Sequence, residues 1–209
     1  MPSLRYSSKN ISNIKLYSDF VDHNFITTDP SVLNKNINKK NFHFFFVPVD
    51  RNIESFDVFK MKPKKDLFYA MSHGVNRATL KEGIEDERIN FLDKLVKKIP
   101  NIKYDFYGFS NKQPIWGNEF NNALINSKMG LNLSRGLPTK YYSSNRIASL
   151  MGNGLLTFIG DKVEMDSFFS KDEMIFYKNT DDLASKVKFY SKNDRERIKI
   201  AKNGKKKYF

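Results

Sequence analysis

The stretch from residue 130 to 160 constrains the fold of this chain more than any other. Two short apolar runs, at 130–134 and 155–159, lie at its ends and are flanked by Gly, Asn and Ser. Such runs are typical of buried parallel strands. The sequence SSNRIASLMGN between them predicts a short helix, with Ser143 or Ser144 as its N-cap. The stretch therefore predicts a strand, loop, helix, strand unit.

The loop and helix start within this unit carry three cations, Arg135, Lys140 and Arg146. We expect these cations to converge on the helix N-terminus. Unpaired N–H groups and the positive end of the helix dipole would then favour an anion such as a diphosphate. On these residues alone, a solvated basic loop is an equally valid interpretation.

From residue 66 onward, predicted strands and helices alternate. Further strands are predicted at 66–72, 103–109 and 173–177, and further helices at 85–100, 118–129, 181–191 and 193–206. This order with short connections predicts a Rossmann-like α/β fold, a parallel sheet flanked by helices. Ligands bind such sheets outside the carboxyl ends of the strands, so the candidate functional residues lie in the loops 73–81, 108–116 and 135–146.

The first 50 residues predict only a partial second α/β domain. A strand is expected at 23–28, a short helix starts at Asp29-Pro30, and the apolar run 42–49 predicts a strand covered on both faces. Residues 51–65 are charged and end in Met-Lys-Pro-Lys-Lys, which favours a linker. The expected domains are 1–50, this linker, and 66–209.

Composition excludes several classes of function. The chain has no cysteine, which rules out disulfides, thiolate metal sites and cysteine nucleophiles. No apolar run reaches the roughly 18 residues of a membrane span, and the N-terminal sequence has no apolar centre, so we expect a cytoplasmic chain. The net charge of +13 is compatible with nucleic acid or an anionic membrane surface. The lysines are scattered without a recognition motif, so no specific nucleic acid is expected.

The order of motifs in the second half resembles the donor-binding C-terminal domain of GT-B glycosyltransferases, in particular the CgeB-like or spore-maturation-like branch. The similar segments are NRIASLMGNGLLTFI, NTDDLASKVKFY and DRERIKIAKNG, and the resemblance extends from about Asp66 to the end. It implies a hexosyltransferase-like enzyme that transfers sugar from a nucleotide-diphosphate sugar to a hydroxyl acceptor, a glycan or lipid-linked molecule, in surface glycan or polysaccharide synthesis. Residues 1–50 would then be the remnant of an acceptor-side domain. Peripheral membrane association and the oligomeric state stay open.

In this family the leaving diphosphate is stabilised by cationic side chains and a helix dipole. No Asp-x-Asp pair is present, so no metal and no cofactor are expected. Carried over by position, the resemblance assigns this catalytic role to Arg77, Lys81 and Arg146. Donor binding is implied for Gly74, Pro114, Ile115, Arg135, Lys140, Ser144, Asn145 and Ser149.

Two departures from the family pattern support an alternative function. Ser149 stands where many relatives have a glutamate that contacts the ribose, and residues 1–50 are too few for a whole Rossmann-like domain. The alternative is a non-catalytic nucleotide-sugar-binding or interaction module, which transfers sugar slowly or not at all. A partial first domain is also expected to expose a sheet edge and apolar surface that favour self-association.

Overall fold

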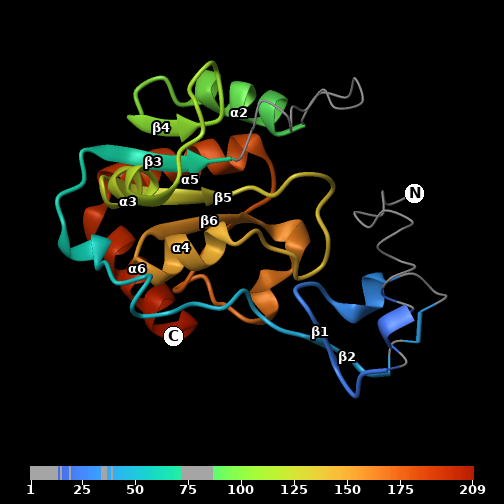
Figure 1. The fold of residues 1–209 in the computed structure, drawn as a ribbon. Coiled ribbons are helices and arrows are strands. Elements are labelled where there is room, and N and C mark those ends of the chain that lie inside the picture. Colours follow the sequence, from blue (N-terminus) through green and yellow to red (C-terminus); the bar gives the residue numbers. More distant parts are fainter. Residues whose placement is uncertain (1–13, 15, 19, 34–36, 39, 72–86) are drawn as a thin grey trace.

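A five-stranded parallel sheet forms the centre of the molecule (Figure 1). The computed structural model describes residues 14, 16–18, 20–33, 37–38, 40–71 and 87–209. The strand order is β4-β3-β5-β6-β7, and every neighbouring pair is parallel. The strands are β3 (Lys65–Ala70), β4 (Tyr104–Tyr107), β5 (Ser127–Asn132), β6 (Leu156–Gly160) and β7 (Ile175–Tyr177).

Helices cover both faces of this sheet (Figure 1). They are α2 (Glu87–Lys98), α3 (Gly117–Ile125), α4 (Arg146–Gly152), α5 (Thr180–Lys192) and α6 (Asp194–Tyr208). Leu67 and Tyr69 of β3 pack in a cluster with α2, α5 and α6, whereas Phe68 and Ala70 pack with α3 and α4. Successive strand residues point to opposite faces, so a strand covered on both sides reads as a continuous apolar run. The predicted fold class is confirmed.

The sheet has a topological switch point between β3 and β5. The chain leaves β3, returns through α2 as β4 on one side, and then crosses through α3 to β5 on the other side. Connections that diverge in this way leave a crevice outside the carboxyl ends of the two central strands, where ligands bind in open α/β sheets. The loop 133–145 and the start of α4 follow β5 at this edge.

Residues 24–44 form a small second unit beside the main sheet (Figure 1). Strands β1 (Asn24–Ile26) and β2 (Phe42–Phe44) pair in parallel. The connection between them contains the 3-10 turn η1 (Pro30–Val32), which Asp29 caps by accepting the Ser31 N–H. The expectation that the run 42–49 is one strand covered on both faces is wrong. It pairs only as far as Phe44, and Phe45 is 39% exposed.

Residues 45–60 run along the larger unit. Val47 packs against α4, and its carbonyl accepts the Tyr208 hydroxyl at 2.9 Å. The 3-10 turn η2 (Val58–Lys60) follows, and the side chain of Val58 is completely buried against α3 and α4. Asn153 holds this region through its side chain and its carbonyl, which accept the N–H groups of Phe56 and Val58. The expected domain boundaries at 50 and 65 stay a prediction.

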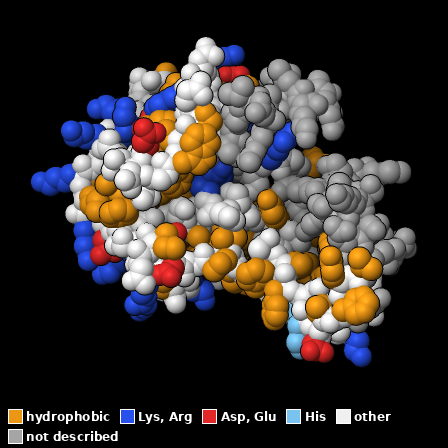
Figure 2. Space-filling view, in the orientation of Figure 1, with side chains coloured by type: hydrophobic (Ala, Val, Ile, Leu, Met, Phe, Trp, Pro, Cys, Tyr) orange, Lys and Arg blue, Asp and Glu red, His pale blue; other side chains and the backbone are white. Residues whose placement is uncertain are grey.

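Charged and apolar side chains occupy different parts of the surface in Figure 2. Lys and Arg side chains are spread around the rim of the larger unit, on the left of this view, and hydrophobic side chains gather over the β1–β2 unit at the lower right. Phe25 is 64% exposed there, and its ring meets Phe45 edge to face. The basic residues visible on this face therefore do not form one continuous stripe.

Candidate functional site

A buried polar network occupies the carboxyl end of β5. Asn132 Nδ2 donates to Ser143 Oγ at 2.6 Å, and Ser144 Oγ donates to Asn132 Oδ1 at 2.9 Å. The expectation that Ser143 or Ser144 caps the helix is wrong, because both hydroxyls bond Asn132 and the N-cap is Asn145. These serines instead fix the loop to the end of the strand.

Arg146 bridges the two strands of the switch point. Its Nε donates to the carbonyl of Ala70 at 2.8 Å, and its Nη1 to the carbonyl of Leu133 at 3.3 Å and to Ser144 Oγ at 2.9 Å. The guanidinium lies over the Tyr69 ring, 4.6 Å from its centroid. The predicted site residue Arg146 therefore lies where ligands of such sheets bind.

The positive charge of Arg146 is compensated by no described carboxylate. Within the described ranges, its hydrogen bonds go to neutral oxygens and it takes part in no ion pair. Burial lowers the pKa of Arg146, the nearby charge of Arg88 contributes to the lowering, and Tyr69 and Tyr142 oppose it. An arginine stays charged in proteins even so. A desolvated cation without a counter-ion marks a candidate anion site.

The start of α4 adds backbone donors to this site. The N–H groups of Ile147 and Ala148 bond the carbonyls of Ser144 and Asn145. In the part of the chain that the structure describes, the N–H groups of Asn145 and Arg146 bond no acceptor. The donor role expected of Ser144 and Asn145 stays a prediction.

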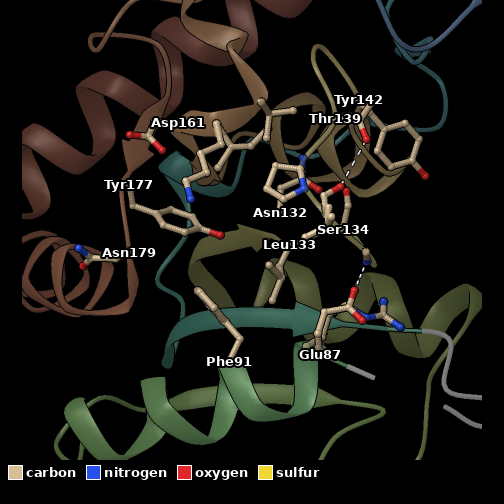
Figure 3. Close-up of a pocket in the computed structure, with 18 of the residues that line it drawn as sticks. Glu87, Phe91, Asn132, Leu133, Ser134, Thr139, Tyr142, Asp161, Tyr177 and Asn179 are labelled. Carbon is tan, nitrogen blue, oxygen red and sulfur yellow. Dashed lines mark hydrogen bonds between the residues drawn. The ribbon is translucent and has the colours of Figure 1, made fainter. Parts of the chain in front are cut away.

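A cavity of about 340 Å³ opens beside this network, over the carboxyl ends of β5, β6 and β7 (Figure 3). Phe91 and Leu133 supply apolar wall, and the Tyr177 hydroxyl points into the space between them. At the opposite side Glu87 accepts the N–H of Gly136 and ties the start of α2 to the loop. Sequence reasoning missed this cavity, although its residues at 160–162 and 177–179 lie at the carboxyl ends of β6 and β7.

The expected convergence of three cations does not occur. Lys140 pairs with Asp29 at 3.1 Å and Glu164 at 3.8 Å, and the hydrogen bond with Asp29 raises the pKa of Lys140. Arg135 is exposed on the loop. None of Arg135, Lys140 and Arg146 lines the cavity.

The other predicted site residues are dispersed. Gly74, Arg77 and Lys81 lie outside the described residues. Pro114 and Ile115 lie in the loop between β4 and α3, where Ile115 packs against the hydrophobic cluster on the α3 side. Ser149 lies within α4, and its carbonyl accepts the Asn153 side chain at 2.9 Å.

The described residues contain no group of three or more His, Asp or Glu side chains placed to hold a metal ion. They also contain no helix that is both long and apolar enough to cross a membrane.

The sequence matches a family model described as glycosyl transferase-like over residues 88–209. The chain belongs to this glycosyl transferase-like family. No curated protein matched the sequence. The predicted likeness to GT-B glycosyltransferases is confirmed, and the CgeB-like branch stays a prediction.

Solved structures share the fold of this glycosyl transferase-like chain at low identity. TarM has a TM-score of 0.65 at 12% identity, covering 100% of this chain and 45% of its own. Anabaena HepE, solved in complex with UDP, has a TM-score of 0.68 at 10% identity, covering 98% of this chain and 64% of its own. Sucrose-phosphate synthase from Thermosynechococcus elongatus has a TM-score of 0.60 at 9% identity, covering 98% and 57%. The chain thus spans only 45% to 64% of these proteins.

Proposed function

We propose that this chain binds a nucleotide-diphosphate sugar at the β3–β5 switch point and acts as a metal-independent GT-B glycosyltransferase toward a hydroxyl acceptor. The observation that carries the proposal is Arg146, a partly buried cation with no carboxylate partner among the described residues, held at the carboxyl ends of β3 and β5. A diphosphate would supply the missing negative charge at the edge where open α/β sheets bind their ligands.

The site would stabilise the leaving diphosphate in two ways. Arg146 provides fixed positive charge, and the N–H groups of Asn145 and Arg146 provide hydrogen-bond donors that are not used among the described residues. Groups held in place before the reaction lower the free energy of a transition state in which negative charge develops. Arg77 and Lys81 complete the proposed set of cations, as the family resemblance implies.

The solved neighbours support uridine nucleotides as the first ligands to test. HepE has been solved with UDP and with UDP and glucose, and S. aureus TarM with UDP among its ligands. The acceptor is proposed from the family resemblance to be a glycan or lipid-linked molecule in surface glycan or polysaccharide synthesis. Peripheral contact with a membrane and a cytoplasmic location belong to the same proposal.

A second candidate is a non-catalytic module that binds a nucleotide sugar. Ser149 favours it, because a short hydroxyl replaces the glutamate expected to hold the ribose. The chain also spans less than two thirds of each of the three compared proteins. Binding without turnover distinguishes this candidate from the enzyme.

The test is calorimetric titration with UDP, GDP, ADP and TDP and their sugar conjugates, followed by measurement of released nucleoside diphosphate with and without a divalent cation. Preference for one base at moderate salt, together with release that does not need the cation, would support the enzyme. Base-specific binding without release would support the binding module. Binding that ignores the base and falls steeply with salt would contradict both, since it indicates a general polyanion site.

A further inference from the structure

The cavity over β5, β6 and β7 is bordered by a tyrosine hydroxyl that nothing else in the site uses. The Tyr177 side chain is only 5% exposed, and its hydroxyl makes no hydrogen bond with another described residue. The close-up shows this hydroxyl pointing into the cavity rather than into the core (Figure 3). A hydroxyl that opens into a cavity is free to bond water or a ligand there.

The walls of the cavity suit a ligand with an apolar face and a polar edge. Phe91, Leu133 and Ile159 are apolar, and the Phe91 and Tyr177 rings lie with centroids 6.0 Å apart. Small-molecule sites are mostly apolar with a few placed polar groups, and about 340 Å³ is near the lower end of their usual size. A single sugar ring fits within this volume, and it presents carbon-bound hydrogens on its faces and hydroxyls on its edge.

The charges around the cavity are of both signs, which favours a ligand without net charge. Glu87 and Asp161 line it together with Arg88, Lys162 and Lys178, and the two lysines are exposed. Burial raises the pKa of Tyr177, and the nearby Tyr69 and Asp161 raise it further. The Tyr177 hydroxyl therefore stays protonated at physiological pH and can both donate and accept a hydrogen bond.

Arg146 does not line this cavity. Asn132 does, and its side-chain amide bonds Ser143 and Ser144, which precede Arg146 in the chain. The carbonyl of the adjacent Leu133 is already bonded by Tyr69 and Arg146. A ligand in the cavity would meet the Tyr177 hydroxyl without displacing a contact of the Arg146 guanidinium.

We propose that this cavity is a separate site for a neutral sugar unit, with the Tyr177 hydroxyl bonding one of its hydroxyl groups. This proposal goes beyond the donor site and does not require that the chain bind a nucleotide. A sugar held there would be a glycan unit other than the one carried by a nucleotide.

Two variants of the cavity make the proposal testable. Tyr177→Phe removes only the hydroxyl, which bonds nothing else among the described residues, so the protein should fold normally. Gly160→Ala places a methyl group 3.8 to 3.9 Å from the Tyr177 ring and hydroxyl, which is ordinary contact, and the backbone there is extended. Tyr190→Phe, on α5 and outside the cavity, is the matched control.

The experiment is ligand-observed NMR and calorimetry with glucose, galactose, N-acetylglucosamine and their disaccharides, up to tens of millimolar, with and without saturating UDP. At least one sugar should bind, with about 3- to 10-fold weaker affinity in Tyr177→Phe and weaker affinity in Gly160→Ala, while Tyr190→Phe is unchanged. Binding should persist with UDP and in Arg146→Met.

Four results would overturn the proposal. Absence of binding by every sugar removes the site, and equal affinity in Tyr177→Phe removes the assigned contact. Displacement of the sugar by UDP assigns the cavity to the nucleotide-linked sugar. Equal binding of cyclohexanol shows an apolar pocket without sugar recognition. Failure of UDP to bind at all would contradict only the proposed donor site.

Discussion

Replacement of Arg146 by methionine should separate a binding role from a structural one. The three hydrogen bonds of the guanidinium go to neutral oxygens, and Tyr69 lies beneath it. If these contacts existed to stabilise the fold, their loss would lower the free energy of unfolding. If the charge exists for an anion, its removal should leave the fold almost unchanged and weaken the nucleotide.

The magnitudes decide between these outcomes. Hydrogen bonds to a charged group contribute about 1.5–3 kcal/mol each, and a cation–π contact about 0.5–2 kcal/mol. Removing a guanidinium from water costs several kcal/mol, and no described carboxylate offsets this cost. Because these terms largely cancel, Arg146→Met should change the free energy of unfolding by less than about 1.5 kcal/mol. The lost phosphate contact, about 1.5–3 kcal/mol, should weaken UDP about 10- to 150-fold.

Urea unfolding and calorimetric titration with UDP measure the two quantities on the same samples. Arg197→Met is the matched control, because Arg197 is buried but pairs with Asp194 through Nε and Nη2, both at 3.0 Å. That variant should lose about 1–3 kcal/mol of stability and keep its UDP affinity. The reasoning is refuted if Arg146→Met unfolds more than 3 kcal/mol more easily while its UDP affinity stays within twofold.

Three further outcomes follow from the described contacts. Lys140→Gln should keep its UDP affinity, measured by calorimetry, within twofold of the wild type, because carboxylates already pair with this ammonium group; a tenfold loss of affinity would show that Lys140 belongs to the donor site. Gly204→Ala should lower the melting temperature although alanine favours helix, because a Cβ there would lie 2.3 Å from the Glu173 carbonyl oxygen; overpacking costs about 1–3 kcal/mol, and a rise would contradict the contact. Burial alone would raise the pKa of Asp182, but hydrogen bonds from Lys186 and the Lys178 N–H lower it below 3.8. Its contribution to stability should therefore be complete near neutral pH and disappear as the pH falls through the lowered pKa. In Asp182→Asn the free energy of unfolding in urea should consequently change less between pH 5 and pH 3 than in the wild type; an equal change would contradict the pairing.

The central sheet could be predicted because burial on two faces leaves a clear sequence pattern. Runs such as 66–72 and 155–159 are apolar at successive positions, and the structure places β3 and β6 there with side chains packed on both sides. The helix expected at 181–191 is also present as α5, and the side chain of its N-cap Asn179 accepts the Asp182 N–H. This cap could be predicted because the two residues that it joins are only three positions apart in the sequence.

Helix ends and cap partners were harder to predict. The helix expected at 118–129 ends at Ile125, since Asn126 turns the chain and Ser127 already belongs to β5. Ser143 and Ser144 are good caps by composition, but Asn132 on the neighbouring strand binds both hydroxyls. A partner that is distant in sequence competes with the local one, and propensity does not report it.

Only part of the candidate site could be predicted from the sequence, for the same reason. Arg146 lies at the helix start that the sequence predicts after a strand, and its role toward a ligand stays a prediction. The partner of Lys140 could not be predicted, because Asp29 belongs to the separate β1–β2 unit. Tyr177 ends a strand and looks like a core residue, and only the cavity beside it reveals its unpaired hydroxyl.

The most direct test of the proposed donor site is a titration of isotope-labelled protein with UDP and UDP-sugars, followed by amide chemical shifts. The account predicts saturable shifts centred on Asn145, Arg146, Leu133 and Met71, the residues around the β3–β5 switch point, and much smaller shifts in Arg146→Met. Shifts that are absent, or centred on the basic surface of α6 without dependence on the base, would contradict it.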